Sequence, residues 1–214
     1  MRECALLIGL TCAVGSWQMF HNAAQVAQIL FATRTLGLTG QQVGLSYVAL
    51  GADTVLSSIL GHSISRRLGP GPCLVAGIAV TGLGWLLLAL VPVNKYGIFA
   101  FAFMLFAFGV GAVLTSINFL SLRQAVTPAP MLGRMTSTMR WLILIPAGPG
   151  ALLGGWLGEH MGLRSSLLFA GVGTLVLSLH AWRSPVLRGV RELPKPHEDE
   201  PSLGAEAVPG ALTP

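Results

Sequence analysis

Long stretches without a charged side chain alternate along this chain with short segments rich in glycine, proline and polar residues. Five windows contain no Asp, Glu, Lys or Arg, and they are bounded by Glu3 and Arg34, Arg67 and Lys95, Lys95 and Arg123, Arg140 and Glu159, and Arg164 and Arg183. A membrane hydrocarbon core of about 30 Å requires about 20 apolar residues in a helix. Each window is near or above that length, so the pattern predicts transmembrane helices.

We expect six such helices, separated by residues that favour turns. Their approximate ranges are 4–33, 43–65, 72–92, 97–122, 135–157 and 164–182. Glycine, proline or polar residues interrupt the apolar pattern at 36–40, 68–72, 91–95, 127–130 and 158–162. Short connections are expected because every backbone polar group inside a membrane must be paired within the protein.

Composition supports the same class of protein. The 214 residues are 53% hydrophobic and 10% charged, with a mean hydropathy of +0.70, whereas soluble domains carry about 25% charged residues. The sequence therefore predicts an all-α membrane protein, a six-transmembrane-helix bundle over residues 1–186. Residues 187–214, rich in proline, glutamate and glycine, are expected to form a disordered cytoplasmic tail.

The distribution of Lys and Arg predicts the orientation of the bundle, because these residues concentrate on the cytoplasmic side. With the N-terminus inside, the outer side holds Arg34, Lys95 and Arg164. The inner side then holds ten basic residues: Arg2, Arg66, Arg67, Arg123, Arg134, Arg140, Arg183, Arg188, Arg191 and Lys195. Both termini are therefore expected in the cytoplasm.

Other classes of function find little support in the sequence. The net charge is +5, but the basic residues are scattered singly between apolar spans. They do not form the basic patch that nucleic-acid binding requires. The chain has no phosphate-binding GxxxxGK[ST] motif and no CxxC or HExxH spacing. We therefore expect no enzyme activity, no cofactor and no metal site, and any transport would be driven by an ion gradient.

Five polar residues recur at intervals of three and four in the first span: Gln18, His21, Asn22, Gln25 and Gln28. This spacing places them on one helix face. Polar groups in a membrane usually face a cavity or a partner helix, so the stripe lines a substrate pathway or forms hydrogen bonds between helices. His21 is either a proton carrier or a neutral hydrogen-bonding residue.

Two further polar residues lie within predicted spans. Asp53 carries the only formal charge between Arg34 and Arg66 and lies near the middle of the second span. Burial disfavours the charged carboxylate, so Asp53 is a candidate for proton coupling or for binding a cation. The alternative is a hydrogen-bonded carboxyl group that ties its helix to Ser or Thr neighbours. Asn118 in the fourth span is a further candidate for the pathway.

The end of the second span carries a recognisable motif. Gly61, Arg66 and Gly69 resemble the G-x-x-x-D-R-x-G signature of the major facilitator superfamily, and Ser65 stands at its aspartate position. The resemblance implies that Gly61, Arg66, Arg67 and Gly69 belong to a loop that helps to hold the inward gate. The alternative is that the arginines only set the topology.

A longer stretch, from Leu122 to Gly173, resembles the tenth to twelfth helices of the drug- and siderophore-exporting branch of that superfamily, of the enterobactin type. The elements that carry the resemblance are Arg123-Gln124, Pro128, Gly133-Arg134, Arg140, Pro149-Gly150, Gly154-Gly155, Gly162 and Arg164. Complete members have twelve helices in two halves. The resemblance implies that this chain is the second half, as a fragment or with the first half supplied by another chain.

Small residues in the fifth span predict a close helix contact. Pro146, Gly148 and Pro149 are expected to make the helix bendable. Gly150 and Gly154 are spaced so that another helix can approach closely.

These observations lead to one hypothesis and one rival. The chain is expected to be a half-length secondary transporter of a bacterial inner membrane, exporting small amphipathic molecules such as drugs or siderophores by proton coupling. Its partners would be the lipid bilayer, the substrate and a first-half six-helix bundle, and not nucleic acid. The rival is a non-transporting membrane fragment or scaffold, which would bury the Gln18–Gln28 stripe within its own six helices.

Overall fold

In the computed structural model, residues 2–92, 96–126 and 132–184 are described, and within these ranges the side chains of 2–6, 49, 50, 52–56, 58–60, 62, 63, 66, 125, 126, 132 and 134 are not. The predicted tail at 187–214 lies outside the described residues. No strand occurs in the three described ranges. Their elements are α1 (Arg2–Leu30), the π-helix η1 (Phe31–Thr35), α2 (Gly40–Leu68), α3 (Pro70–Leu90), α4 (Gly97–Val126), α5 (Leu132–Leu144), α6 (Ala147–His160) and α7 (Leu163–Arg183).

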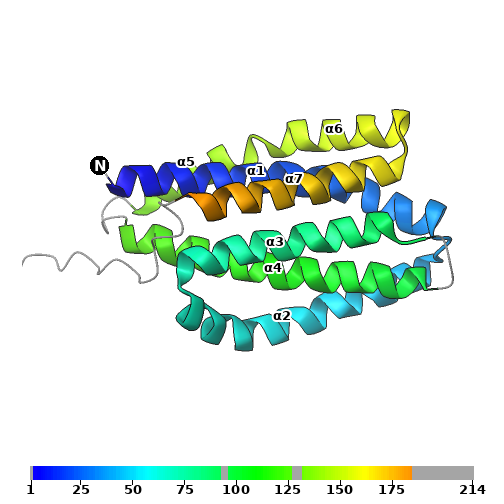
Figure 1. Cartoon of the computed structure of the whole chain (residues 1–214), viewed down its shortest axis with the longest axis horizontal. Coiled ribbons are helices and arrows are strands. Elements are labelled where there is room, and N and C mark those ends of the chain that lie inside the picture. The colour runs from blue at the N-terminus through cyan, green and yellow to red at the C-terminus, as the bar shows by residue number, and fades with distance from the viewer. Residues whose placement is uncertain (1, 93–95, 127–131, 185–214) are drawn as a thin grey trace, which may run out of the picture.

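The helices lie side by side along the long axis of the molecule, with the start of α1, the α2–α3 junction and the end of α7 at the same end (Figure 1). Among the described residues, four segments are long and apolar enough to cross a membrane: Pro70–Leu90, Gly97–Gln124, Met135–His160 and Leu163–Arg183. Helices α1 and α2 each contain 29 residues, which extend over about 43 Å. The structure therefore confirms the predicted all-α membrane bundle.

Close helix packing organises the bundle around α3, which packs on α4 and α7, while α2 packs on α4. Glycines bring α3 and α4 together: a Cβ atom on Gly77 would lie 2.7 Å from the carbonyl oxygen of Gly111. A cluster of large side chains then fills the core at the end where η1 lies, and its largest members are Phe31, Trp85, Phe101, Met104 and Leu167. Since α1 packs on α5, α6 and α7, α7 joins the two sides of the molecule.

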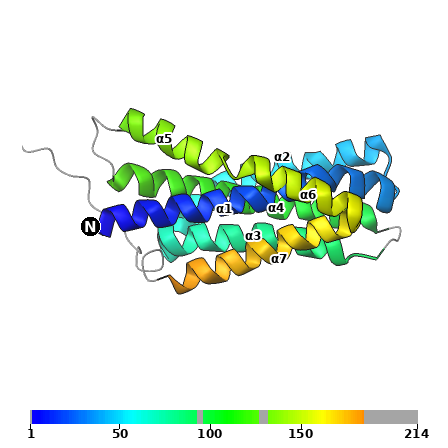
Figure 2. The ribbon, with the colours of Figure 1, turned by 90° about the horizontal axis from the view of Figure 1, so that it is seen from above.

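The fifth pass differs from the single helix expected at 135–157. Helix α5 ends at Leu144 and α6 begins at Ala147, and the two follow one another along one pass with a change of direction between them (Figure 2). Pro146 and Pro149 have no N–H to donate to the preceding turn, which explains the interruption. The amide of Gly150 still donates to the carbonyl of Pro146 at 3.0 Å, so α6 resumes at once.

The first helix also ends differently from the helix predicted at 4–33. The α-helix ends at Leu30, and one π-helical turn carries the chain to Thr35. Helix α2 then begins earlier than expected, because Thr39 and Gln42 form a capping box: the Gln42 amide donates to the Thr39 hydroxyl and the Thr39 amide to the Gln42 side chain. At the other end of α2, Gly69 alone separates it from α3.

Candidate functional site: the polar stripe of the first helix

Two sides of α1 are covered by α6 and α7. A Cβ atom on Gly150 would collide with the carbonyl oxygen of Met19, and one on Gly154 would collide with that of Ala23. The predicted small-residue contact is therefore confirmed, and the helix that approaches is α1. From α7, the Ser166 hydroxyl donates to the Ala23 carbonyl at 3.1 Å. These contacts fix which face of α1 remains available to the polar stripe.

A third side of α1 faces α3 and α4 through aromatic rings. The His21 ring stacks on Phe108 of α4, with centroids 4.7 Å apart and planes at 11°. Trp17 stacks on His21 at 5.6 Å, and Trp85 of α3 lies 6.3 Å away. The Trp17 indole N–H donates to the Thr81 hydroxyl at 3.0 Å, which anchors the group to α3. We call Trp17, His21, Trp85 and Phe108 the His21 ring cluster.

His21 is held in this cluster by stacking. Its Nδ1 is buried and has no hydrogen-bond partner among the residues that the structure describes. The ring is therefore placed at the boundary between the packed core and the remaining polar face of α1. Both interpretations of His21, as a proton carrier or as a neutral polar residue, stay predictions.

The remaining side of α1 carries Gln18, Asn22 and Gln25, which we call the open stripe. Gln25 is exposed, and Gln18 and Asn22 are partly exposed. Gln28, by contrast, is 2% exposed and donates to the Gln25 side-chain oxygen at 2.6 Å. The Asn22 amide donates to the Gln18 carbonyl of its own helix at 2.8 Å. The five predicted residues thus divide into Gln28, which is buried, His21, which is partly exposed and held among aromatic rings, and the open stripe.

Asn118 is not joined to this stripe. It is 1% exposed in α4, and its side-chain oxygen accepts a hydrogen bond from the Ser65 hydroxyl of α2 at 2.5 Å. Its amide donates to the Leu114 carbonyl at 2.8 Å. Ser65, at the aspartate position of the gate signature, therefore connects the end of α2 to α4. In this arrangement Asn118 holds two helices together.

The other predicted gate residues surround the same junction. Gly69 has a φ of 86°, a conformation that favours glycine, and Gly61 packs against Leu114 of α4. Arg67 is exposed at the end of α2. The side chains of Arg66 and of the proton-coupling candidate Asp53 lie outside the described residues, although the α2 backbone passes through both positions.

Several contacts were missed by reasoning from the sequence alone. Trp85 and Phe108 come to His21 from helices distant in sequence, so no local spacing indicates them. Trp17, four residues before His21, was detectable because i and i+4 share a helix face. Arg164 makes a further contact of this kind at the end of the bundle where η1 lies. It donates to the Val91 carbonyl at 2.9 Å and lies 5.9 Å from the centre of the Phe31 ring.

Comparisons with known proteins agree on the class of the chain. The sequence profile of the Major Facilitator Superfamily matches residues 6–212. "Enterobactin exporter EntS" of Salmonella choleraesuis (strain SC-B67) is 26% identical over 142 residues, which are 66% of this chain and 33% of that protein. The protein of the same name from Salmonella paratyphi A (strain ATCC 9150 / SARB42) is 25% identical over 178 residues, or 82% of this chain and 41% of the relative. The chain therefore spans less than half the length of these relatives.

Proposed function

The chain belongs to the major facilitator superfamily, and we propose that it forms one six-helix half of a secondary transporter that exports small amphipathic molecules. Transporters of this superfamily are built from two related halves, with the substrate site near the middle of the membrane between them. In this proposal the bundle rocks against a first-half bundle, and α1 contributes one wall of the shared pathway.

The observation that carries the proposal is the open stripe. Gln18, Asn22 and Gln25 lie in the second half of α1, within the span predicted at 4–33, and keep exposed surface on a side of α1 that α6, α7 and the His21 ring cluster leave uncovered. Polar side chains at this depth are unfavourable against lipid. A water-filled pathway shared with a second bundle provides the environment that these side chains require.

The rival scaffold would bury the whole stripe within its own helices. Burial of Gln28 agrees with that expectation, but the exposed surface of Gln18, Asn22 and Gln25 favours the transporter. The substrate class is supported by the relatives, which are named as exporters of enterobactin. It is also supported by the presence of amide side chains on the open side of α1 next to the aromatic rings that stack between α1 and α4.

Energy for export is proposed to come from a proton gradient, with Asp53 as the coupling carboxyl group. Asp53 lies in the middle of α2, the helix whose end is tied to α4 by the Ser65–Asn118 hydrogen bond. Protonation at this position would therefore act on the helix that leads to the gate loop. We further propose that the protein resides in a bacterial inner membrane with both termini in the cytoplasm, as the basic residues predict.

The test is efflux of a lipophilic dye from a drug-sensitive bacterium that expresses this chain alone, or together with a matching first half. The proposal predicts efflux with both halves present, and loss of efflux when a protonophore collapses the gradient. Absence of efflux from a pair that assembles in the membrane would favour the scaffold.

A further inference from the structure

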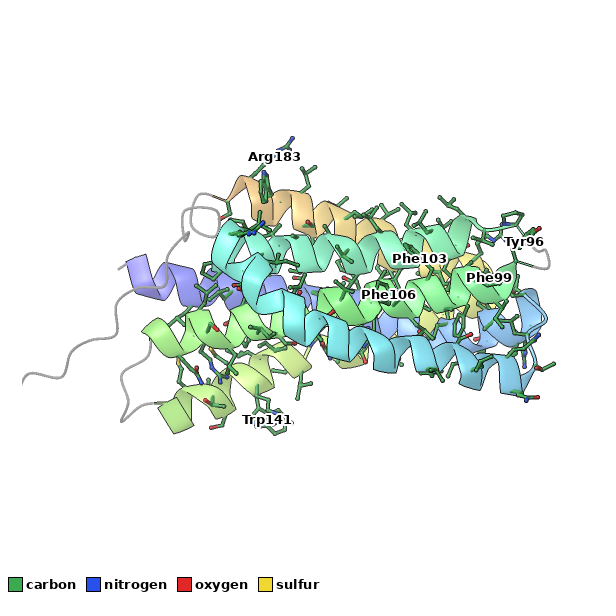
Figure 3. All side chains as sticks on the ribbon, turned by 90° about the horizontal axis from the view of Figure 1, so that it is seen from below. Tyr96, Phe99, Phe103, Phe106, Trp141 and Arg183 are labelled. Atoms are coloured by element: carbon green, nitrogen blue, oxygen red, sulfur yellow. The ribbon has the colours of Figure 1, made fainter. Side chains whose placement is uncertain are left out.

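A groove of about 490 Å³ lies between the first half of α1 and α5. Thr11, Cys12 and Ser16 of α1 form one wall, and Met135 and Met139 of α5 form part of the other. Trp141 of α5 points away from the bundle (Figure 3) and is 72% exposed. The groove is therefore on the side of α5 that faces α1, and it has the size of a site for a small organic molecule.

The groove ends where α1 meets the proline break, at Gly15. A Cβ atom on Gly15 would lie 3.7 Å from both the Leu142 carbonyl oxygen and the Pro146 ring. The α1 backbone thus comes close to α5 where α5 ends, and the two helices enclose a hollow toward their starting ends. The groove is consequently built by the helix geometry rather than by one displaced side chain.

The chemistry of the walls selects an apolar occupant. None of the residues that line the groove carries a charge. The Thr11 hydroxyl already donates to the Leu7 carbonyl of its own helix at 2.8 Å, which leaves few polar atoms to serve a ligand. Methionine side chains adapt to occupants of different shape, so Met135 and Met139 suit a series of related apolar groups.

The groove leads into the open stripe. Thr11, Gly15, Gln18 and Asn22 follow one another at intervals of three or four residues, which places them on one face of α1. Gln18 lies about 4.5 Å along the helix axis from Gly15. The apolar groove and the amide side chains are therefore neighbouring parts of one surface.

We propose that this groove binds the apolar part of the exported molecule while the open stripe contacts its polar part. The inference rests on the proposed function and adds where the substrate binds and why it must be amphipathic. The positions of polar and apolar side chains along α1 distinguish this occupant from a membrane lipid. The amide side chains of the open stripe lie beyond the end of the groove that is nearer the middle of α1, whereas the end near the start of α1 is lined by Leu7 and Ile8. A lipid needs the reverse order, with its headgroup at the membrane surface.

Cys12 provides a direct test because its side chain is exposed within the groove, whereas Cys73 is buried. The chain is placed in membrane vesicles with its matching first half, and the rate of Cys12 labelling by N-ethylmaleimide is measured with and without the uncharged dye Nile red. Cys12→Ser gives the background from other thiols. We expect Nile red to slow Cys12 labelling at least fivefold. A rate that Nile red leaves unchanged overturns the proposal.

A matched control separates binding in the groove from a general effect of the dye on the bilayer. Val172 is 47% exposed on α7, away from the groove, and labelling of Val172→Cys in a Cys12→Ser chain should not be slowed. Equal slowing at both positions would overturn the proposal, because the dye would then act through the lipid.

A transport assay with a variant whose groove is filled by a larger side chain completes the test. Cys12→Phe should reduce Nile red efflux at least fivefold at unchanged membrane abundance, whereas Val172→Phe, on an exposed position away from the groove, should not. Equal efflux by Cys12→Phe and Val172→Phe would overturn the groove proposal and leave the transporter intact. Protection of Cys12 without efflux by the unsubstituted pair would support the groove as a binding site and contradict the proposed transport.

Discussion

Gly154 of α6 lies directly against the backbone carbonyl of Ala23 in α1, with no room between them for a single methyl group. Gly150 and Met19 make the same contact one helical turn away. This pair of contacts fixes the rotation of α1. It turns Gln18, Asn22 and Gln25 toward the side of the helix that the other described helices leave uncovered.

The contact predicts the effect of adding one methyl group. Gly154→Ala should destabilise the bundle by about 1–3 kcal/mol, because overpacking forces the helices apart. Gly155→Ala is the matched control, since a Cβ atom on Gly155 would meet nothing within 4 Å. Thermal unfolding of the purified variants in detergent measures the difference. Equal unfolding temperatures for the two variants would show that α1 and α6 are not in this contact.

The hydrogen bond between Ser65 and Asn118 makes a second prediction. Ser65→Ala leaves the buried Asn118 oxygen without its partner, and we expect a loss of about 1–2 kcal/mol. Ser116→Ala, at an exposed position of α4, should change stability little. A double-mutant cycle with Asn118→Leu measures the coupling between the two side chains. A coupling energy of zero would contradict the role of Asn118 in joining α2 to α4.

If the open stripe lines the pathway, replacing its amides should lower transport without lowering the amount of the protein in the membrane. Replacing Gln18 and Asn22 together by leucine should lower dye efflux at least tenfold, because the pathway wall becomes apolar. Membrane abundance should stay the same, since both side chains are partly exposed and Gln25, which accepts the hydrogen bond of the buried Gln28, is kept. Gln41→Leu, an exposed amide at the start of α2, serves as the control. Full efflux by the double variant would remove α1 from the pathway.

Proton coupling predicts a specific phenotype for Asp53→Asn. Asparagine keeps the shape of the side chain but does not titrate, so efflux should no longer respond to the proton gradient. Dye accumulation is measured at several external pH values, with the unsubstituted pair as reference. An unchanged response to pH would leave the transporter in place and assign coupling to another residue.

Most of the bundle could be predicted from the sequence, because the free-energy cost of placing a charge in a membrane dominates the distribution of residues along the chain. Charges are expensive within a membrane, so windows without Asp, Glu, Lys or Arg locate the spans within a few residues. The interruption at Ile145 and Pro146 was expected only as a bend. Two helices form instead because Pro146 and Pro149 together remove two backbone donors from consecutive turns.

The candidate site was harder to predict, because helical spacing identifies a face but not its neighbours. The five stripe residues do share one side of α1, yet the division between Gln28, which is buried, and Gln25, which is exposed, depends on how the other helices pack around α1. The environment of His21 depends on Trp85 and Phe108, which lie more than 60 residues away in the sequence. Such contacts are set by tertiary packing and leave no local signal.

The most direct test of the central claim is the water accessibility of the open stripe. Single cysteines are introduced at Gln18, Asn22 and Gln25 in a chain with Cys4, Cys12 and Cys73 replaced by serine, and at Val176 of α7, which is 61% exposed, as a lipid-facing control. The chain is assembled with its matching first half and treated with a charged, water-soluble thiol reagent. The account predicts rapid labelling at the three stripe positions and none at Val176. Stripe cysteines as unreactive as the one at Val176 would show that this face meets lipid or protein, and would contradict a transport pathway along α1.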